Sequence, residues 1–252
     1  MRRYCLYMFE KPTEDIDKGI EKPPQRKNDE EAQERIDTVI DTKALSEEME
    51  SKPFKSEKLI EALARLVIEL EDNITEYDTV LSDDASGRLV SLLLKKIIDK
   101  KREEVEKDKA QIYFIAPWQQ SNFGWSLAIK KFIADRKDSL GKTLLVTEYI
   151  QSGKTIRSLM EILEQQNIDF DTAAVSILHE SDDYIKKAGI KYGEAGGLAA
   201  AALCKATKFS GVEKTSTEKS IHPKRAEESD PENVRAARKD IDTLSEELSK
   251  LI

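Results

Sequence analysis

The hydrophobic pattern of this chain alternates between short apolar runs and longer segments with helical spacing. Runs of strand length cover residues 77–82, 111–116, 144–146 and 171–178, and residues 191–194 could add a fifth. Helical or long connections lie between these runs, which implies a mainly parallel sheet with helices on both faces. The predicted fold class is therefore α/β.

Helices with one buried face are predicted within this domain. Ser56 is a suitable N-cap for a helix whose apolar stripe runs over residues 59–70. Residues 89–98 are apolar almost all round, which predicts a buried helix. A third helix begins near Thr155, where apolar residues recur at helical spacing up to Leu163.

Charged helices are predicted outside this domain, towards both ends of the chain. Residues 29–50 carry only a thin apolar stripe; they could pack on the domain edge or mediate pairing, but we expect a solvated helix. Residues 231–251 have a narrow stripe that could pair with a second copy or lie on the domain. The polar residues 213–230 predict a disordered segment. The predicted parts are an N-terminal extension (1–55), an α/β domain (56–212) and a polar tail with a C-terminal helix (213–252).

Composition narrows the function classes. The 252 residues suffice for one sizeable α/β domain with extensions, and the net charge of -8 disfavours general nucleic-acid binding. No apolar run approaches the ~20 residues of a membrane span, and Glu10 and Lys11 interrupt the apolar N-terminus before a signal-peptide core could form. Cys5 and Cys204 show neither metal spacing nor a disulfide framework. We therefore expect a cytoplasmic protein.

The stretch from Thr143 to Leu163 is a strand, a polar turn and a helix, the unit that binds phosphate in open α/β sheets. In the turn, Gly153 lets the backbone approach an anion, and Ser152 and Thr155 add hydroxyl donors. Gly-Lys-Thr suggests a P-loop, but that motif needs a glycine where Glu148 stands, and an acid there would repel phosphates. The alternative is an ordinary strand-to-helix turn.

This stretch resembles the signature of the type I phosphoribosyltransferases, which is an apolar strand, two adjacent acids, two apolar residues and a Thr-Gly-x-Thr-like turn. Ser152-Gly153-Lys154-Thr155 matches the turn and Glu148 the second acid, whereas Thr147 replaces the first acid. In that family the turn binds the 5-phosphate of phosphoribosyl pyrophosphate and the acids bind the ribose hydroxyls. The resemblance implies that fold over residues 57–212, with Gln151 in the phosphate loop and Glu148 as the catalytic carboxylate.

The loop after the first strand, residues 83–88, is similar in position to the family's pyrophosphate loop. Ser86, Gly87 and Arg88 would bind pyrophosphate, since arginine is a planar cation with several donors. Asp83 and Asp84 suit a Mg²⁺ ion that shares the site, although Asp84 could instead cap the next helix. Residues 118–142 stand where the family has a long mobile loop, and they imply a lid over the substrate. Within this segment, residues 127–133 predict a helix.

Three functions stay open on the sequence. An enzyme would move phosphoribose from phosphoribosyl pyrophosphate, with Mg²⁺, to a nitrogenous acceptor and release pyrophosphate. A non-catalytic sensor of the same fold is favoured by Thr147 and by Gln151, because an amide cannot accept the acceptor's proton. An interaction protein would depend on the charged flanking helices. The expected partners of the enzyme are the small-molecule donor and acceptor, with no membrane or nucleic acid, and two copies could form a homodimer.

Overall fold

A five-stranded parallel sheet forms the centre of the molecule, as the computed structural model shows. It describes residues 29–83, 87–115, 123–150, 153–177, 189–195, 207–213, 224–227 and 229–252. The strands are β1 (Thr79–Asp83), β2 (Gln111–Ile115), β3 (Thr143–Ile150), β4 (Phe170–Ile177) and β5 (Tyr192–Ala195). Their order is β2-β1-β3-β4-β5, and each neighbouring pair is parallel. The predicted α/β class is confirmed.

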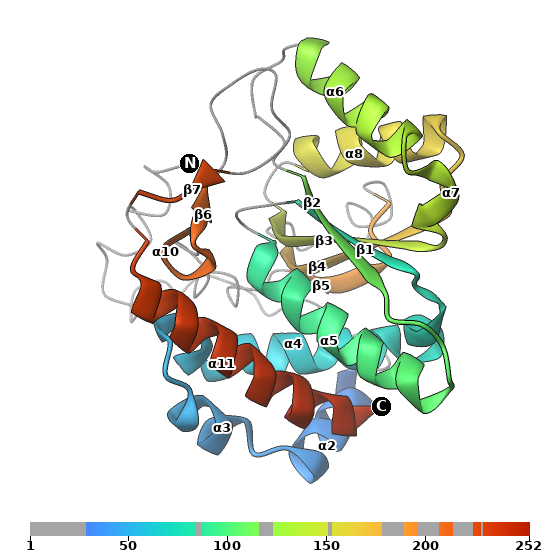
Figure 1. Cartoon of the computed structure of the whole chain (residues 1–252). Helices are drawn as coiled ribbons and strands as arrows, with labels where there is room; N and C mark the ends of the chain where they lie inside the picture. Colours follow the sequence, from blue (N-terminus) through green and yellow to red (C-terminus); the bar gives the residue numbers. More distant parts are fainter. Residues whose placement is uncertain are drawn as a thin grey trace.

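Helices cover both faces of the sheet (Figure 1). One face carries α4 (Glu57–Leu70), α5 (Arg88–Glu104) and α11 (Pro231–Leu248), and the other carries α6 (Phe123–Ala134), α7 (Lys137–Leu140) and α8 (Lys154–Gln165). The predicted cap of α4 is confirmed, because the Leu59 N–H donates to Ser56 Oγ at 3.4 Å. The layers are helix, sheet and helix, with a hydrophobic core on each side of the sheet.

The two cores follow from the alternation of side chains along the strands. Leu144 and Val146 of β3 belong to the core with α4, α5 and α11, which we call the α5-side core. Leu145 of β3 and Leu81 of β1 belong to the core with α6 and α8, which we call the α8-side core. Each central strand is therefore apolar on both faces, as buried parallel strands are.

The N-terminal helical segment differs from the prediction. Residues 29–50 form α2 (Asp29–Val39) and α3 (Thr42–Glu48), and a 3₁₀ turn, η2 (Lys52–Lys55), leads into α4. Three of the four residues of the thin apolar stripe, Ile36, Ile40 and Leu45, are buried in the α5-side core, and Met49 joins them. The fourth, Val39, is 40% exposed. The expectation of a solvated helix was wrong, because a short stripe suffices when it packs across another helix, here α4.

The C-terminal helix lies on the domain, which was one of its two predicted arrangements. Ile241, Leu244 and Leu248 of α11 are buried in the α5-side core, and η5 (Ser249–Leu251) continues it. The segment predicted to be disordered also contains paired residues. Its strand β7 (Lys224–Arg225) pairs antiparallel with β6 (Val212–Glu213), which follows the short helix α10 (Thr207–Ser210). The boundaries at residues 55 and 212 stay a prediction, although the flanking helices share the domain's core.

The segment expected to be a mobile lid is largely a packed crossover. A parallel connection from β2 to β3 must cross the sheet, and α6 and α7 make that crossing. The helix predicted over residues 127–133 is confirmed as part of α6. Ile129, Ile133 and Leu140 are buried in the α8-side core, so residues 123–142 are not the expected mobile loop. The segment also has two tryptophans that could stack on a base or pack on the domain; Trp118 lies outside the described residues, and so does the side chain of Trp125. Within the described part of the chain, no helix is long and apolar enough to cross a membrane.

Candidate functional site

The two loops singled out in the sequence leave neighbouring strands. β1 and β3 pair directly, with Ser82, near the carboxyl end of β1, opposite Val146 in the middle of β3. The helix after β1, α5, packs on one face of the sheet, whereas the helix after β3, α8, packs on the other. The strand order therefore reverses between β1 and β3. Open α/β sheets bind ligands beyond the carboxyl ends of the strands at such a switch point.

Two buried carboxylates and one hydroxyl stand at this switch point. Asp83 is 6% exposed, Thr147 3% and Glu148 5%. The Thr147 hydroxyl donates to Asp83 Oδ2 at 3.5 Å, which connects the last residue of β1 to β3. Asp83 and Thr147 lie two residues beyond Leu81 and Leu145, so they share the α8 side of the sheet. Glu148 lies two residues beyond Val146 and so belongs to the α5 side.

Gly87 and Arg88 form the start of α5. Gly87 is the N-cap residue with ordinary backbone angles, and its N–H donates to the Asp83 carbonyl at 3.0 Å. A Cβ on Gly87 would lie 3.0 Å from the Val146 carbonyl oxygen and 3.1 Å from that of Asp83. Glycine is thus needed for close packing of the helix start against β3, a reason separate from the approach of a ligand. The pyrophosphate role of this loop stays a prediction.

The Arg88 guanidinium stacks on Phe114 of the neighbouring strand β2, with 3.9 Å between the guanidinium carbon and the ring centroid. Stacking fixes the plane of the guanidinium, and its N–H donors lie in that plane. A cation held in this way suits the recognition of a planar set of oxygens. This contact places the Arg88 guanidinium over Phe114 of β2.

The predicted phosphate turn leads into α8 through a left-handed residue. Gly153 has φ 65° and ψ 2° and is the N-cap of the helix, whose first turn closes when the Arg157 N–H donates to the Gly153 carbonyl at 3.0 Å. Lys154 is exposed and Thr155 is half-buried. The first amides of a helix have no partner within the helix and carry its positive dipole end. The turn therefore supplies the donors that an anion needs.

Four predicted site residues, Asp84, Ser86, Gln151 and Ser152, lie outside the described residues. Gly87 is the N-cap residue of α5 and lies three residues after Asp84, the alternative cap that the sequence offers. In the described ranges, no group of three or more His, Cys, Asp or Glu residues could hold a metal ion. Mg²⁺ commonly takes only one or two carboxylates and completes its shell with substrate phosphates. The buried carboxylate of Asp83 fits such a site.

Comparison with known proteins assigns no family to this fold. No protein-family model matches the chain, and no curated protein matches it. The architecture is a Rossmann-like parallel α/β fold. A functional assignment therefore depends on the residues at the switch point.

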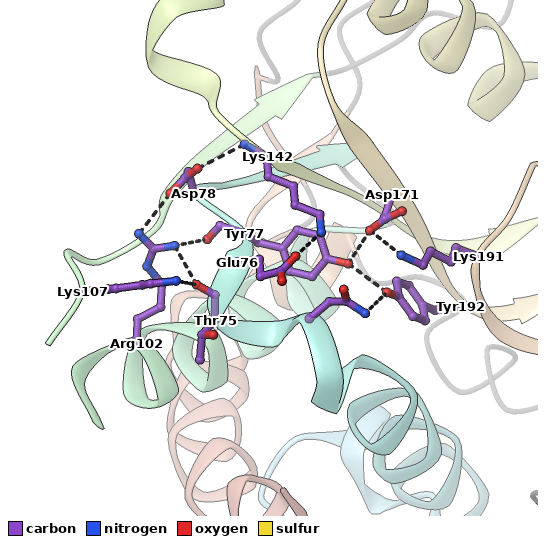
Figure 2. Close-up of polar contacts among 11 residues, drawn as sticks. Thr75, Glu76, Tyr77, Asp78, Arg102, Lys107, Lys142, Asp171, Lys191 and Tyr192 are labelled. Carbon is purple, nitrogen blue, oxygen red and sulfur yellow. Dashed lines mark hydrogen bonds and ion pairs between the residues drawn. The ribbon is translucent and has the colours of Figure 1, made fainter. Parts of the chain in front are cut away.

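The opposite edge of the sheet, at the amino ends of the strands, carries a dense polar network (Figure 2). The Tyr77 hydroxyl donates to Asp171 Oδ2 at 2.7 Å and lies 3.0 Å from the Tyr192 hydroxyl. Burial, reinforced by these two hydrogen bonds, raises the pKa of Tyr77 far above its usual range. Lys191 completes an ion pair with Asp171 at 2.9 Å.

The buried Arg102 extends this network to the start of β1. It donates to the Tyr77 carbonyl at 2.8 Å and to the Thr75 carbonyl at 3.2 Å, and it pairs with Asp78 at 3.1 Å. Backbone carbonyls and the Asp78 carboxylate therefore satisfy the buried Arg102 guanidinium at this edge. The sequence predicted neither this network nor the contact between Asp83 and Thr147, because both depend on strand register. The one available signal was that polar residues sit at both ends of predicted strands.

Proposed function

We propose that the switch point between β1 and β3 binds phosphoribosyl pyrophosphate and that the protein is a phosphoribosyltransferase-like enzyme. One observation carries this proposal. β1 and β3 are neighbours in the sheet, so the pyrophosphate loop and the phosphate turn of the resemblance leave the same edge at adjacent strands. Nothing in the chain order alone brings them together. The position agrees with the general rule for ligands in open α/β sheets.

Each loop would bind one charged part of the donor. The turn of Gln151, Ser152, Gly153, Lys154 and Thr155 would bind the 5-phosphate through the amides and dipole of α8. Ser86, Gly87 and Arg88 would bind the pyrophosphate, with the stacked guanidinium as a planar donor. Glu148, in the carboxyl half of β3, would accept hydrogen bonds from ribose hydroxyls.

In the transfer itself, the bond between C1 of the ribose and the pyrophosphate oxygen breaks, and pyrophosphate leaves with the electron pair. A bond forms between C1 and a nitrogen of the acceptor, which gives up its proton to solvent. Positive charge develops on the ribose in between, and the carboxylate of Glu148 would stabilise it. A Mg²⁺ ion carried by the donor, with Asp83 and Asp84 as its candidate ligands, would offset the charge of the pyrophosphate.

A non-catalytic sensor for the same ligand is the second candidate. Thr147 stands where the family has its first acid, and Gln151 offers an amide in place of a base. Release of pyrophosphate in the presence of purine, pyrimidine or pyridine bases separates the two, because a sensor binds the donor without turnover. The interaction hypothesis loses its main support, since the apolar stripes of α2, α3 and α11 are buried against the domain's own core. The expected homodimer stays a prediction.

Calorimetric titration with phosphoribosyl pyrophosphate and Mg²⁺ tests the proposal. Glu148→Gln should weaken binding by about 1.5–3 kcal/mol, the range for a hydrogen bond to a charged group. The matched control is Glu161→Gln, the same chemical change at an exposed position of α8, which should bind like the parent. Unchanged affinity in Glu148→Gln would contradict both the enzyme and the sensor.

A further inference from the structure

We propose that Asp83 supplies the carboxylate that the signature lacks at Thr147, so that the ribose site takes its two acids from two neighbouring strands. This inference rests on the proposed function, because it concerns the same ligand. In the resemblance, both acids stand side by side on one strand. Here one of them, Glu148, stands on β3, and the other comes from the end of β1.

The placement of Asp83 follows from the strand pairing. The register sets Ser82 opposite Val146, so the next residue on each strand, Asp83 and Thr147, come together. Both side chains lie on the α8 side of the sheet, and the hydroxyl of Thr147 is 3.5 Å from Asp83 Oδ2. An acid missing from one strand is thus replaced within hydrogen-bond reach by an acid on the next.

In this arrangement, threonine suits position 147 better than a second acid would. A carboxylate at position 147 would stand against that of Asp83 in a buried place, and two like charges there disfavour each other's ionised form. A threonine hydroxyl instead donates a hydrogen bond to Asp83 Oδ2, which fixes the orientation of that carboxylate. We regard Thr147 as a positioning residue for Asp83.

Two carboxylates in this arrangement suit a vicinal diol. Asp83, the last residue of β1, lies on the α8 side of the sheet, and Glu148, in the carboxyl half of β3, lies on the α5 side, so they flank the switch point from opposite faces. A ribose offers two adjacent hydroxyl donors, and each carboxylate accepts from a donor. The alternative role for Asp83, as a ligand of Mg²⁺, predicts no dependence on the diol.

Binding of ribose 5-phosphate and 2,3-dideoxyribose 5-phosphate, measured by calorimetry with EDTA present, distinguishes these roles. The parent should bind ribose 5-phosphate, which has the diol, more tightly than the dideoxy sugar phosphate; this ratio of affinities is the diol preference. Asp83→Asn should lower this preference by about tenfold or more, as the loss of a hydrogen bond to a charged group implies, and leave affinity for the dideoxy sugar unchanged. Thr147→Val should lower it by a smaller factor. Asp169→Asn, an exposed aspartate before β4, is the control and should match the parent.

A swap of the two residues is the sharper test. Asp83→Thr with Thr147→Asp returns the acid to the signature position and keeps one hydroxyl and one carboxylate in contact. The double variant should recover a diol preference within about threefold of the parent, although Asp83→Thr alone loses it. This comparison tests whether Asp83 supplies the missing acid even if Asp83→Asn does not fold.

The outcomes separate this inference from the proposed function. A parent protein that binds neither sugar phosphate would overturn both. If the parent prefers the diol and Glu148→Gln loses that preference but Asp83→Asn keeps it, only the inference fails. Equal weakening of both sugars in Asp83→Asn would assign it a purely structural role and also overturn the inference. An effect that appears only after Mg²⁺ is added would make Asp83 a metal ligand instead.

Discussion

Gly153 shows how one residue can be fixed for two separable reasons. Its left-handed backbone, with φ 65°, would cost most non-glycine residues about 1 kcal/mol or more. Asparagine adopts this conformation several times more often than other non-glycine residues do. The proposed phosphate also needs a close approach to the backbone at this point. The conformational reason follows from the structure alone, and the second depends on the proposed function.

Two substitutions separate these reasons. Gly153→Ala should lower the free energy of unfolding in urea by about 1 kcal/mol, and Gly153→Asn should lower it by less. If the anion also approaches here, Gly153→Asn should bind phosphoribosyl pyrophosphate more weakly than the parent despite its near-normal stability. Equal stability of Gly153→Ala and the parent would show that the left-handed conformation imposes no strain.

At this scale the sequence indicated candidate residues but not their neighbours. Gly153 and Thr155 could be predicted because a polar turn between an apolar run and a helical stripe is a local pattern. The contact between Asp83 and Thr147 could not, because it depends on which strands pair and in which register. The close packing that requires glycine at position 87 could not be predicted either, because its neighbour Val146 belongs to another strand.

Among the elements, α11 and the N-terminal part of the chain share a core, and a buried carboxylate of α11 adds polar contacts between them. Asp240, 2% exposed, accepts from the backbone N–H of Glu50 at 2.9 Å and from that of Ser51 at 2.7 Å. It also accepts from the Ser51 hydroxyl. Glu50 and Ser51 immediately precede the turn η2, so a side chain of α11 holds the chain where it enters this turn.

Asp240→Ala should therefore be costly, because it leaves several donors without an acceptor in a place without water access. We expect at least about 2 kcal/mol loss in the free energy of unfolding, measured in urea. Asp242→Ala, two residues further on the same helix, is the matched control. Its side chain is 58% exposed and pairs with Lys96 at 2.7 Å, so it should cost no more than about 1 kcal/mol. Equal losses of unfolding free energy in the two variants would show that the buried Asp240 stabilises the fold no more than an exposed aspartate does.

The sequence predicted most elements of the sheet and its helices, and it failed where tertiary contacts decide. The strands from β1 to β4 and helices α4, α5 and α8 have strong local patterns. Residues 29–50 have a weak stripe, and only their contact with α4 explains their burial. The helix over residues 127–133 was predicted, but the resemblance assigned residues 118–142 as a whole to a mobile loop, and only the burial of Ile129 and Ile133 shows that this helix packs on the sheet.

For the whole molecule, the two edges of the sheet differ in chemistry. The carboxyl edge carries the polar loops and buried acids of the proposed site. At the amino edge, Tyr77, Asp171 and Tyr192 satisfy one another across segments far apart in the chain (Figure 2). Substitutions at the amino edge should accordingly change stability and its pH dependence without changing ligand affinity.

Tyr77 gives the clearest test of this division. Because burial and its hydrogen bonds raise the pKa of Tyr77, the folded state holds a proton that the unfolded state releases near pH 10.0. Its contribution to stability is fully present below that pH and is lost as pH rises above it, by up to about 1.4 kcal/mol per pH unit. Lys142, whose pKa is raised by its hydrogen bond to Glu76, changes stability in the same direction.

The informative quantity is thus the difference in the free energy of unfolding between Tyr77→Phe and the parent. Near pH 7, Tyr77→Phe should be less stable by about 1–2 kcal/mol, since the hydrogen bonds to Asp171 and Tyr192 are lost. Above about pH 10 this difference should shrink, because phenylalanine has no proton to lose. Urea unfolding at both pH values measures it, and calorimetry should find ligand affinity unchanged. A difference that stays constant with pH would mean that the phenol of Tyr77 is not kept protonated by the fold.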